Sequence, residues 1–118
     1  MSKPSQNYKI IPTKNFLAEA KKLLKKYPNI KQDFLNLAKV LKADPITGND
    51  YLGNGCYKVR MQITDKGDGQ SGGARVIINV QVINKEVYVI STYDKGEQET
   101  IKDHILKKLL KKIFSAFA

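Results

Sequence analysis

The sequence has very few of the residues that build disulfides and metal centres. Its 118 residues include one cysteine, Cys56, and one histidine, His104. A single cysteine excludes an internal disulfide and a zinc site built on cysteines, and it fits a reducing compartment. One histidine and scattered acidic residues do not supply the ligand set of another kind of metal site. We therefore expect a cytoplasmic protein that needs no metal.

Long apolar runs are missing as well. No stretch is long and apolar enough to cross a bilayer, and the opening residues MSKPSQNYKI lack the apolar run and small-residue cleavage site of a secretory signal. With 42% hydrophobic residues, the chain has material for one core and not for several. We expect a single domain over residues 1–118, with residues 1–7 flexible.

Positive charge is what the sequence has in excess. Its 21 lysines and arginines oppose 11 acidic residues, which gives a formal net charge of +10 at pH 7. A field of that sign favours a polyanionic partner, which could be nucleic acid, an anionic membrane surface or an acidic protein. All but two of these cations, Arg60 and Arg75, are lysines, and a lysine excess also serves solubility. Charge alone leaves these alternatives open.

The first half of the chain is typical of one strand followed by two helices. Residues 8–12 (YKIIP) predict a short strand, and Thr13 suits the N-cap of a helix. Apolar residues then recur at helical spacing in two segments, which are separated by Tyr27-Pro28 and closed by the polar residues 44–50. We expect a helical hairpin.

The second half changes to the two-residue period of strands. Three segments have this pattern: residues 55–63 (GCYKVRMQI), 74–83 (ARVIINVQVI) and 86–94 (EVYVISTYD). From Glu99 the helical period returns, with one apolar and one lysine-rich face. The order β-α-α-β-β-β-α predicts an α+β fold. Its antiparallel-dominated, twisted sheet of about four strands would pack against the N-terminal helical hairpin and the C-terminal helix.

A glycine-rich loop separates the first two of these three strands. Its residues 67–72, GDGQSG, match the spacing G-x-G-x-x-G of dinucleotide-binding folds. That fingerprint works because its glycines lead into a helix whose N-terminus holds the pyrophosphate, whereas a strand pattern follows here. A calcium loop is excluded too, because Val76 stands where the closing acidic residue is needed. We expect no nucleotide cofactor and no calcium ion.

Basic side chains gather on one face of the predicted sheet. Lys58 and Arg60 share a strand face, and antiparallel pairing would bring Arg75 within reach of Arg60 or Gln62. Lys95 ends the last strand. Like charges so close together cost folding energy, which a bound phosphate would offset. A phosphate site and a solvated sheet face both fit this spacing.

At these residues the sequence resembles the RelE superfamily of bacterial toxins from toxin–antitoxin pairs. The likeness is carried by GCYKVRM (55–61), SGGARVIINV (71–80) and VYVISTYDKGE (87–97), and the order of elements is similar to the RelE-like fold over nearly the whole chain. Within the superfamily the HigB-like branch is the nearer likeness. It has the same glycine-glycine-x-arginine start of the central strand and the same tyrosine-x-lysine close of the last strand.

The resemblance implies a ribonuclease that needs no metal or small-molecule cofactor and cuts mRNA in the ribosomal A site. In that reaction a 2′-hydroxyl attacks the adjacent phosphate and the 5′-oxygen leaves. The implied catalytic residues are Lys58, Arg60, Arg75 and Lys95, and the implied RNA-binding residues are Tyr93, Lys66 and Asn79. Lys58 is the candidate proton acceptor, because neighbouring cations favour a neutral lysine whereas arginine stays protonated. The two arginines would hold the phosphate and Lys95 would assist the leaving oxygen.

The sequence departs from its relatives where they often have aromatic residues. Ile78 and Asn79 occupy that stretch of the central strand, and Ile101 stands near the start of the final helix. Aromatic rings orient a nucleobase by stacking. Tyr93 or His104 would have to take over that function for full activity.

The resemblance also implies an antitoxin, in the HigB-like branch usually a helix-turn-helix protein, and the charge of +10 suits an acidic one. Two alternative functions stay open. A ParE-like toxin of the same fold would inhibit DNA gyrase without cutting RNA, and the cluster of basic residues argues against it. The basic amphipathic residues 101–117 could instead bind a membrane surface, but the sheet needs a cover, and this helix is the nearest one.

Overall fold

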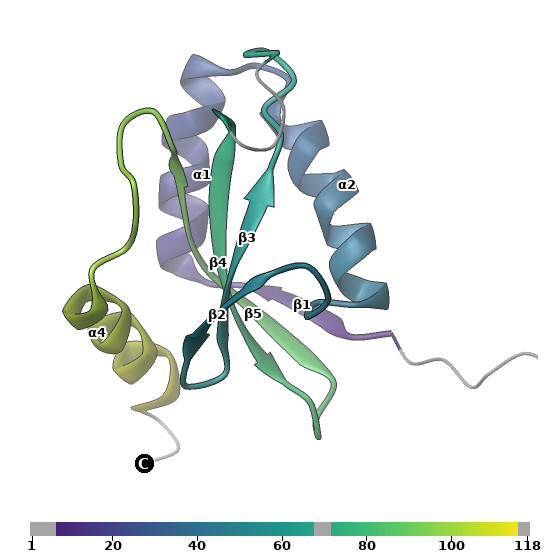
Figure 1. Cartoon of the computed structure of the whole chain (residues 1–118), viewed down its shortest axis with the longest axis vertical. Coiled ribbons are helices and arrows are strands. Elements are labelled where there is room, and N and C mark those ends of the chain that lie inside the picture. Colours follow the sequence, from purple (N-terminus) through teal and green to yellow (C-terminus); the bar gives the residue numbers. More distant parts are fainter. Residues whose placement is uncertain (1–6, 68–71, 116–118) are drawn as a thin grey trace, which may run out of the picture.

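A computed structural model of the protein describes residues 7–67 and 72–115, which form a five-stranded sheet with helices on both faces (Figure 1). The strands are β1 (Lys9–Pro12), β2 (Asp50–Gly53), β3 (Cys56–Met61), β4 (Ala74–Gln81) and β5 (Glu86–Asp94). The helices are α1 (Lys14–Lys26), α2 (Ile30–Ala43) and α4 (Asp103–Phe114). The expected flexibility of residues 1–7 falls outside the described residues except for Asn7.

The strands lie in the order β1-β5-β4-β3-β2. The pairs β2–β3, β3–β4 and β4–β5 are antiparallel, and β1 alone runs parallel to its neighbour β5. The prediction of an α+β fold with an antiparallel-dominated sheet is therefore confirmed.

The sheet has one strand more than the roughly four that the sequence predicted. The additional strand is β2, a four-residue segment, DYLG, without a clear two-residue alternation. It forms a hairpin with β3 through a tight turn in which Asn54 and Gly55 both adopt positive φ angles. An Asn-Gly pair is a strong hairpin signal, so this pair was the sequence feature that could have revealed β2.

Two core clusters lie on opposite faces of the sheet. Helices α1 and α2 cover the face that carries Val76 and Ile78, whereas α4 covers the face that carries Ile77 and Ile90. The predicted alternation along β4 is thus confirmed. The faces differ because successive side chains of a strand point to opposite sides.

Helix α4 buries its apolar side against the sheet. Leu106 is buried there beside Tyr93, and Leu109, Leu110 and Ile113 pack around it, while the lysines of the helix are exposed. Among the described residues, no helix combines the length and apolar character needed to cross a membrane.

Candidate functional site

The predicted basic residues meet on the face of the sheet that α4 covers. In the strand register Arg60 of β3 lies directly opposite Arg75 of β4, and Arg75 lies directly opposite Tyr93 of β5. Lys58 is two residues from Arg60 and so shares its face. We call Lys58, Arg60, Arg75 and Lys95 the basic face.

Lys95 joins the basic face from beyond the end of β5. Its side chain is half-buried, and its backbone N–H donates to the carbonyl oxygen of Gly73, with the two atoms 3.0 Å apart. Gly73 lies two residues before Arg75. This backbone bond therefore fixes Lys95 beside the start of β4.

Arg75 is the most buried member of the basic face. Only 4% of the residue is exposed, and its Nη1 donates to the carbonyl oxygen of Ala74 at 3.1 Å. Burial lowers the pKa of Arg75, the charge of Arg60 lowers it further, and Tyr93 and Asp50 act in the opposite direction. Surroundings that disfavour a cation in this way favour the approach of an anion.

Asp50 is the acidic residue of this region, and the sequence analysis did not identify it. Its Oδ2 lies 3.1 Å from Nη2 of Arg60, and both side chains are 45% exposed. Asp50 belongs to β2, where it pairs with Lys58, so recognising the Asn54-Gly55 hairpin would have placed it. An ion pair this exposed contributes about 0–1 kcal/mol, and an RNA phosphate could displace the carboxylate.

Tyr93 places a hydroxyl next to Arg75 inside the fold. The residue is 5% exposed, and its buried Oη forms no hydrogen bond with any described residue. Burial raises the pKa of Tyr93, and the nearby Thr100 side chain and the charge of Arg75 offset part of that rise. A buried hydroxyl without a hydrogen-bond partner is uncommon in folded proteins.

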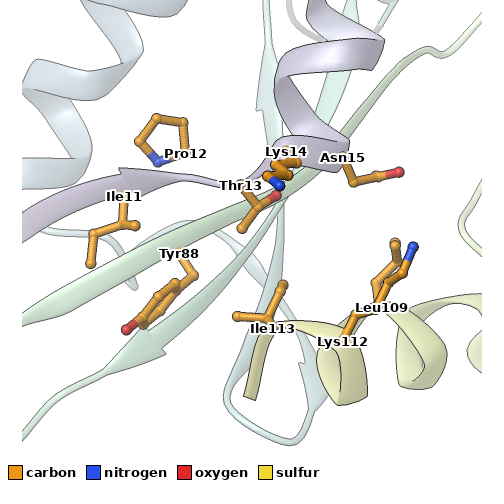
Figure 2. A pocket seen from close by; sticks show the side chains of 9 residues that line it. All are labelled: Ile11, Pro12, Thr13, Lys14, Asn15, Tyr88, Leu109, Lys112 and Ile113. Carbon is orange, nitrogen blue, oxygen red and sulfur yellow. The ribbon is translucent and has the colours of Figure 1, made fainter. Parts of the chain in front are cut away.

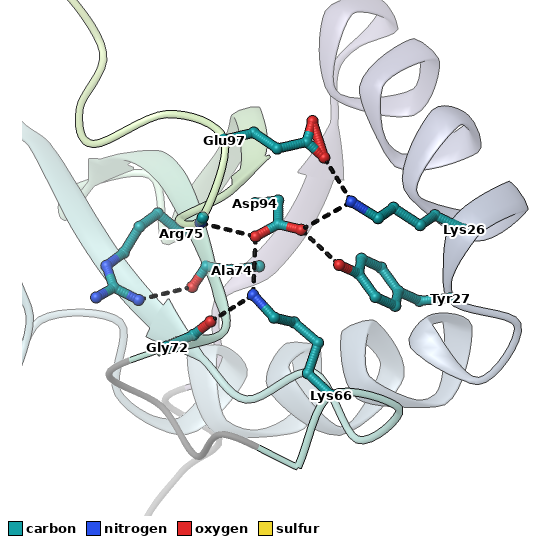
Figure 3. A network of polar contacts seen from close by, with 9 residues as sticks. Lys26, Tyr27, Lys66, Gly72, Ala74, Arg75, Asp94 and Glu97 are labelled. Carbon is teal, nitrogen blue, oxygen red and sulfur yellow. Dashed lines mark hydrogen bonds and ion pairs between the residues drawn. The ribbon is translucent and has the colours of Figure 1, made fainter.

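Lys66 and Asn79, the other two predicted RNA-binding residues, are not members of the cross-strand set Arg60, Arg75 and Tyr93. Each of them forms hydrogen bonds with other parts of the chain. Nζ of Lys66 donates to Oδ1 of Asp94 at 3.0 Å and to the carbonyl oxygen of Gly72 at 2.8 Å (Figure 3). Asn79 is buried, and its Nδ2 donates to the carbonyl oxygen of Asn54 in the β2–β3 turn at 2.9 Å. Their RNA-binding roles stay predictions.

The lone histidine and the lone cysteine differ in exposure. His104 is exposed on the first turn of α4, whereas Cys56 is buried, and burial raises the pKa of its thiol. Within residues 7–67 and 72–115, no three histidine, cysteine or acidic side chains come together as metal ligands would. Ile101 packs half-buried beside Tyr93 in the second core cluster.

A pocket of about 640 Å³ opens between the start of α1 and helix α4 (Figure 2). Its lining is Ile11, Pro12, Thr13, Lys14, Asn15, Tyr88, Leu109, Lys112 and Ile113. None of these belongs to the basic face, so the predicted chemistry is not located in this pocket.

Comparison with known proteins points to one family. The family model described as the RelE toxin of the RelE/RelB toxin–antitoxin system matches residues 9–117. No curated protein matches the chain.

Three solved structures are similar in fold. A double arginine mutant of the Escherichia coli toxin RelE in the free state is 19% identical, with a TM-score of 0.59, covering 91% of this chain and 98% of that one. The RelBE2 toxin–antitoxin complex of Mycobacterium tuberculosis is 15% identical, with a TM-score of 0.60 and coverages of 79% and 97%. Isolated E. coli RelE is 23% identical, with a TM-score of 0.51 and coverages of 90% and 98%. These likenesses confirm the predicted RelE-like fold, and assignment to the HigB-like branch stays a prediction.

Proposed function

Because the chain belongs to the RelE family of toxins from toxin–antitoxin systems, we propose that it acts as a ribosome-dependent mRNA endonuclease in the cytoplasm. The observation that carries this proposal is the pairing of Arg60 with Arg75 across neighbouring strands, beside the buried hydroxyl of Tyr93. Two adjacent guanidinium groups repel each other, whereas a phosphate bound between them is attracted to both.

The two arginines are suited to the charge that develops during RNA cleavage. Each guanidinium carries several donors in a planar fork, which matches the oxygens of a phosphate. Arg75 is held by its strand and by the Ala74 carbonyl, so it needs little reorganisation as the reaction proceeds. Arg60 is exposed and can leave Asp50 to meet the substrate.

The proposed reaction needs no metal and no cofactor. The 2′-hydroxyl oxygen attacks the adjacent phosphorus, and its proton passes to the Lys58 amine. Arg60 and Arg75 stabilise the additional negative charge on the phosphate oxygens. The bond to the 5′-oxygen breaks, and Lys95 donates a proton to that oxygen. The products are a 2′,3′-cyclic phosphate and a 5′-hydroxyl.

Access to Arg75 requires movement. Because Arg75 and Tyr93 are 4% and 5% exposed, an RNA phosphate cannot reach them in the described arrangement. Tyr93 packs with Leu106 of α4 and with Ile101 of the segment before that helix. Substrate binding therefore requires that α4 and the segment before it move away from the basic face.

We further propose that a cognate antitoxin holds the toxin inactive. One of the similar structures is itself a toxin–antitoxin complex. The formal charge of +10 favours an acidic partner, because complementary charge speeds association and selects against other partners. A helix-turn-helix antitoxin is the form that we expect.

The proposal is tested by mapping the 5′ ends of mRNA on programmed ribosomes. Wild type should cut in the A-site codon and only when ribosomes are present, and Arg75→Lys and Arg60→Ala should lose about 10²–10³-fold in rate. Lys39→Ala is the matched control, because it removes one positive charge from an exposed position on α2.

Each alternative function gives its own result in this experiment. Cuts that persist in both arginine variants would place the active site elsewhere. Growth arrest without any cut would favour gyrase inhibition or membrane binding, and gyrase assays and leakage of anionic vesicles would separate those two.

A further inference from the structure

We infer that Asp94 is a positioning residue, which holds Lys95 and the start of β4 in the geometry that the proposed cleavage needs. The inference rests on the proposed function and deepens it. Asp94 is the last residue of β5, lies between Tyr93 and Lys95, and is 3% exposed.

The Asp94 carboxylate has partners on both oxygens (Figure 3). Oδ2 accepts a hydrogen bond from the Tyr27 hydroxyl at 2.6 Å and lies 3.8 Å from Nζ of Lys26. Oδ1 accepts from Nζ of Lys66 at 3.0 Å and from the backbone N–H of Gly96 at 2.8 Å. One buried carboxylate thus joins the end of α1, the β3–β4 loop and the turn that follows β5.

Hydrogen bonds hold the backbone at Lys95 and at the residue after it. The Gly96 N–H bond closes the turn immediately after Lys95, and the Lys95 N–H itself donates to the Gly73 carbonyl. Lys66 bridges the Asp94 carboxylate and the Gly72 carbonyl, so the residue before Gly73 is held from the same point. The relative positions of Lys95 and Arg75 therefore depend on the Asp94 carboxylate.

Asp94 acts through its neighbours, because its side chain points away from the basic face. It contacts Tyr27 of α1 on one side of the sheet, whereas Tyr93 packs under α4 on the other. Figure 3 shows the Arg75 side chain leading away from the carboxylate. RNA bound on the basic face would not touch Asp94.

The network keeps Asp94 charged in spite of its burial. Burial alone would raise the pKa of Asp94, but the Tyr27 and Gly96 hydrogen bonds and the Lys66 ammonium hold it below its ordinary value of 3.8. A buried carboxylate stays ionised at neutral pH only where such partners are fixed around it. This supports a rigid arrangement at the end of β5.

The test measures kcat and KM of mRNA cleavage on programmed ribosomes for Asp94→Asn. Asparagine keeps an oxygen that can accept a hydrogen bond but loses the charge that holds Lys66. We expect kcat to fall about 100-fold, while KM stays within about twofold because Arg60 and Arg75, which hold the RNA phosphate, are unchanged. Because unfolding also lowers the apparent kcat at constant KM, kcat is calculated from the concentration of folded protein.

Asp33→Asn is the matched control. Asp33 is also a buried acid that ties the β3–β4 loop, because its carboxylate accepts from the backbone N–H of Thr64 at 3.0 Å and from the Thr64 hydroxyl. Among the described residues, the Asp33 carboxylate forms its hydrogen bonds with Thr64 and none with Lys95 or the start of β4. An equal fall of kcat in Asp33→Asn would show a general loss of stability and would overturn the inference.

A second measurement separates this inference from the proposed function. Amide hydrogen exchange at Lys95 reports the Lys95–Gly73 bond directly, and we expect it to be about tenfold faster in Asp94→Asn and unchanged in Asp33→Asn. A wild type that cuts no mRNA would defeat the proposed function alone, and the exchange rates would still decide the positioning. Unchanged exchange at Lys95 would defeat the positioning, whatever the activity.

Tyr27→Phe covers the case in which Asp94→Asn does not fold. It removes one hydrogen bond to the carboxylate and leaves the Lys66 and Gly96 contacts in place. A smaller fall of kcat at constant KM is the expected result, and wild-type kcat in this folded variant would contradict the inference.

Discussion

At the scale of single residues, Gly73 shows why a glycine stands immediately before Ala74 and Arg75. A Cβ atom on Gly73 would collide with the Met61 carbonyl oxygen and would lie 2.9 Å from the backbone nitrogen of Ile63. The backbones of the two β-hairpin arms approach so closely here that no side chain fits between them. The glycine thus sets the path of the chain into β4.

Gly73→Ala should lower the free energy of unfolding by about 3 kcal/mol, because the backbone must move to relieve the collision. Gly48→Ala is the control: its added Cβ meets open space, and only the positive φ of 82° opposes it, which costs about 1 kcal/mol. Urea unfolding of the two variants measures both. Equal losses would mean that relieving the collision at Gly73 costs no more than the backbone strain at Gly48.

Cys56 should be chemically inert in the folded protein. It is fully buried and accepts a hydrogen bond from Nδ2 of Asn79 at 3.5 Å, and burial raises the pKa of its thiol. Thiolate is the reactive form, so a thiol reagent at pH 8 should label the protein only after denaturant is added. Rapid labelling of the native protein would contradict this placement.

The sequence predicted Arg60 or Gln62 as the neighbour of Arg75, and the strand register selects Arg60. Strand alternation and antiparallel pairing are local rules, and they placed the two arginines on one face. The partner of Lys66 is Asp94, 28 residues away, and no local pattern links the two. Tertiary contacts of this kind depend on the whole fold.

At the scale of the elements, Thr13 joins helix α1 to strand β5. Its Oγ1 accepts from the backbone N–H of Phe16 as the predicted N-cap, and the same hydroxyl donates to the carbonyl oxygen of Val89 at 2.8 Å. The hydroxyl therefore fixes both the start of the helix and its position on the sheet.

Thr13→Ala should cost about 2 kcal/mol of unfolding free energy, at the high end for loss of an N-cap because the bond to Val89 is lost as well. Thr13→Ser keeps the hydroxyl and should lose less than half as much. Thermal unfolding of both variants checks this. If the serine variant is as unstable as the alanine variant, the methyl group rather than the hydroxyl is responsible.

The C-terminal helix illustrates a limit of periodicity. An amphipathic, lysine-rich helix suits a sheet and a membrane surface equally well by its pattern alone. The outcome depends on whether the sheet offers an apolar surface, and here Ile77 and Ile90 provide one under Leu106. The packing of α4 on the sheet was the favoured expectation because the sheet needs a cover and this helix is the nearest one.

At the scale of the whole molecule, the Asp94 network links stability to pH. The pKa of Asp94 is lowered by folding, so its contribution is fully present above the ordinary value of 3.8 and is lost as the pH falls through the folded pKa. Asp94→Asn should be about 3 kcal/mol less stable than wild type at pH 7, because it leaves Lys66 without its charge partner.

This difference should shrink as the pH is lowered from 4 to 2, where wild-type Asp94 becomes protonated. Urea unfolding of both proteins across this range measures it. A gap that stays constant down to pH 2 would show that the charge of Asp94 contributes nothing to stability.

The parallel pair of β1 and β5 bears on how the protein is made. It joins residues 9–12 to residues 86–89, and β5 lies between β1 and the other three strands. During synthesis the first strand therefore has no partner until β5 has left the ribosome. Contacts so distant in the sequence form late. A translating ribosome thus carries the first strand of this toxin unpaired until β5 has emerged.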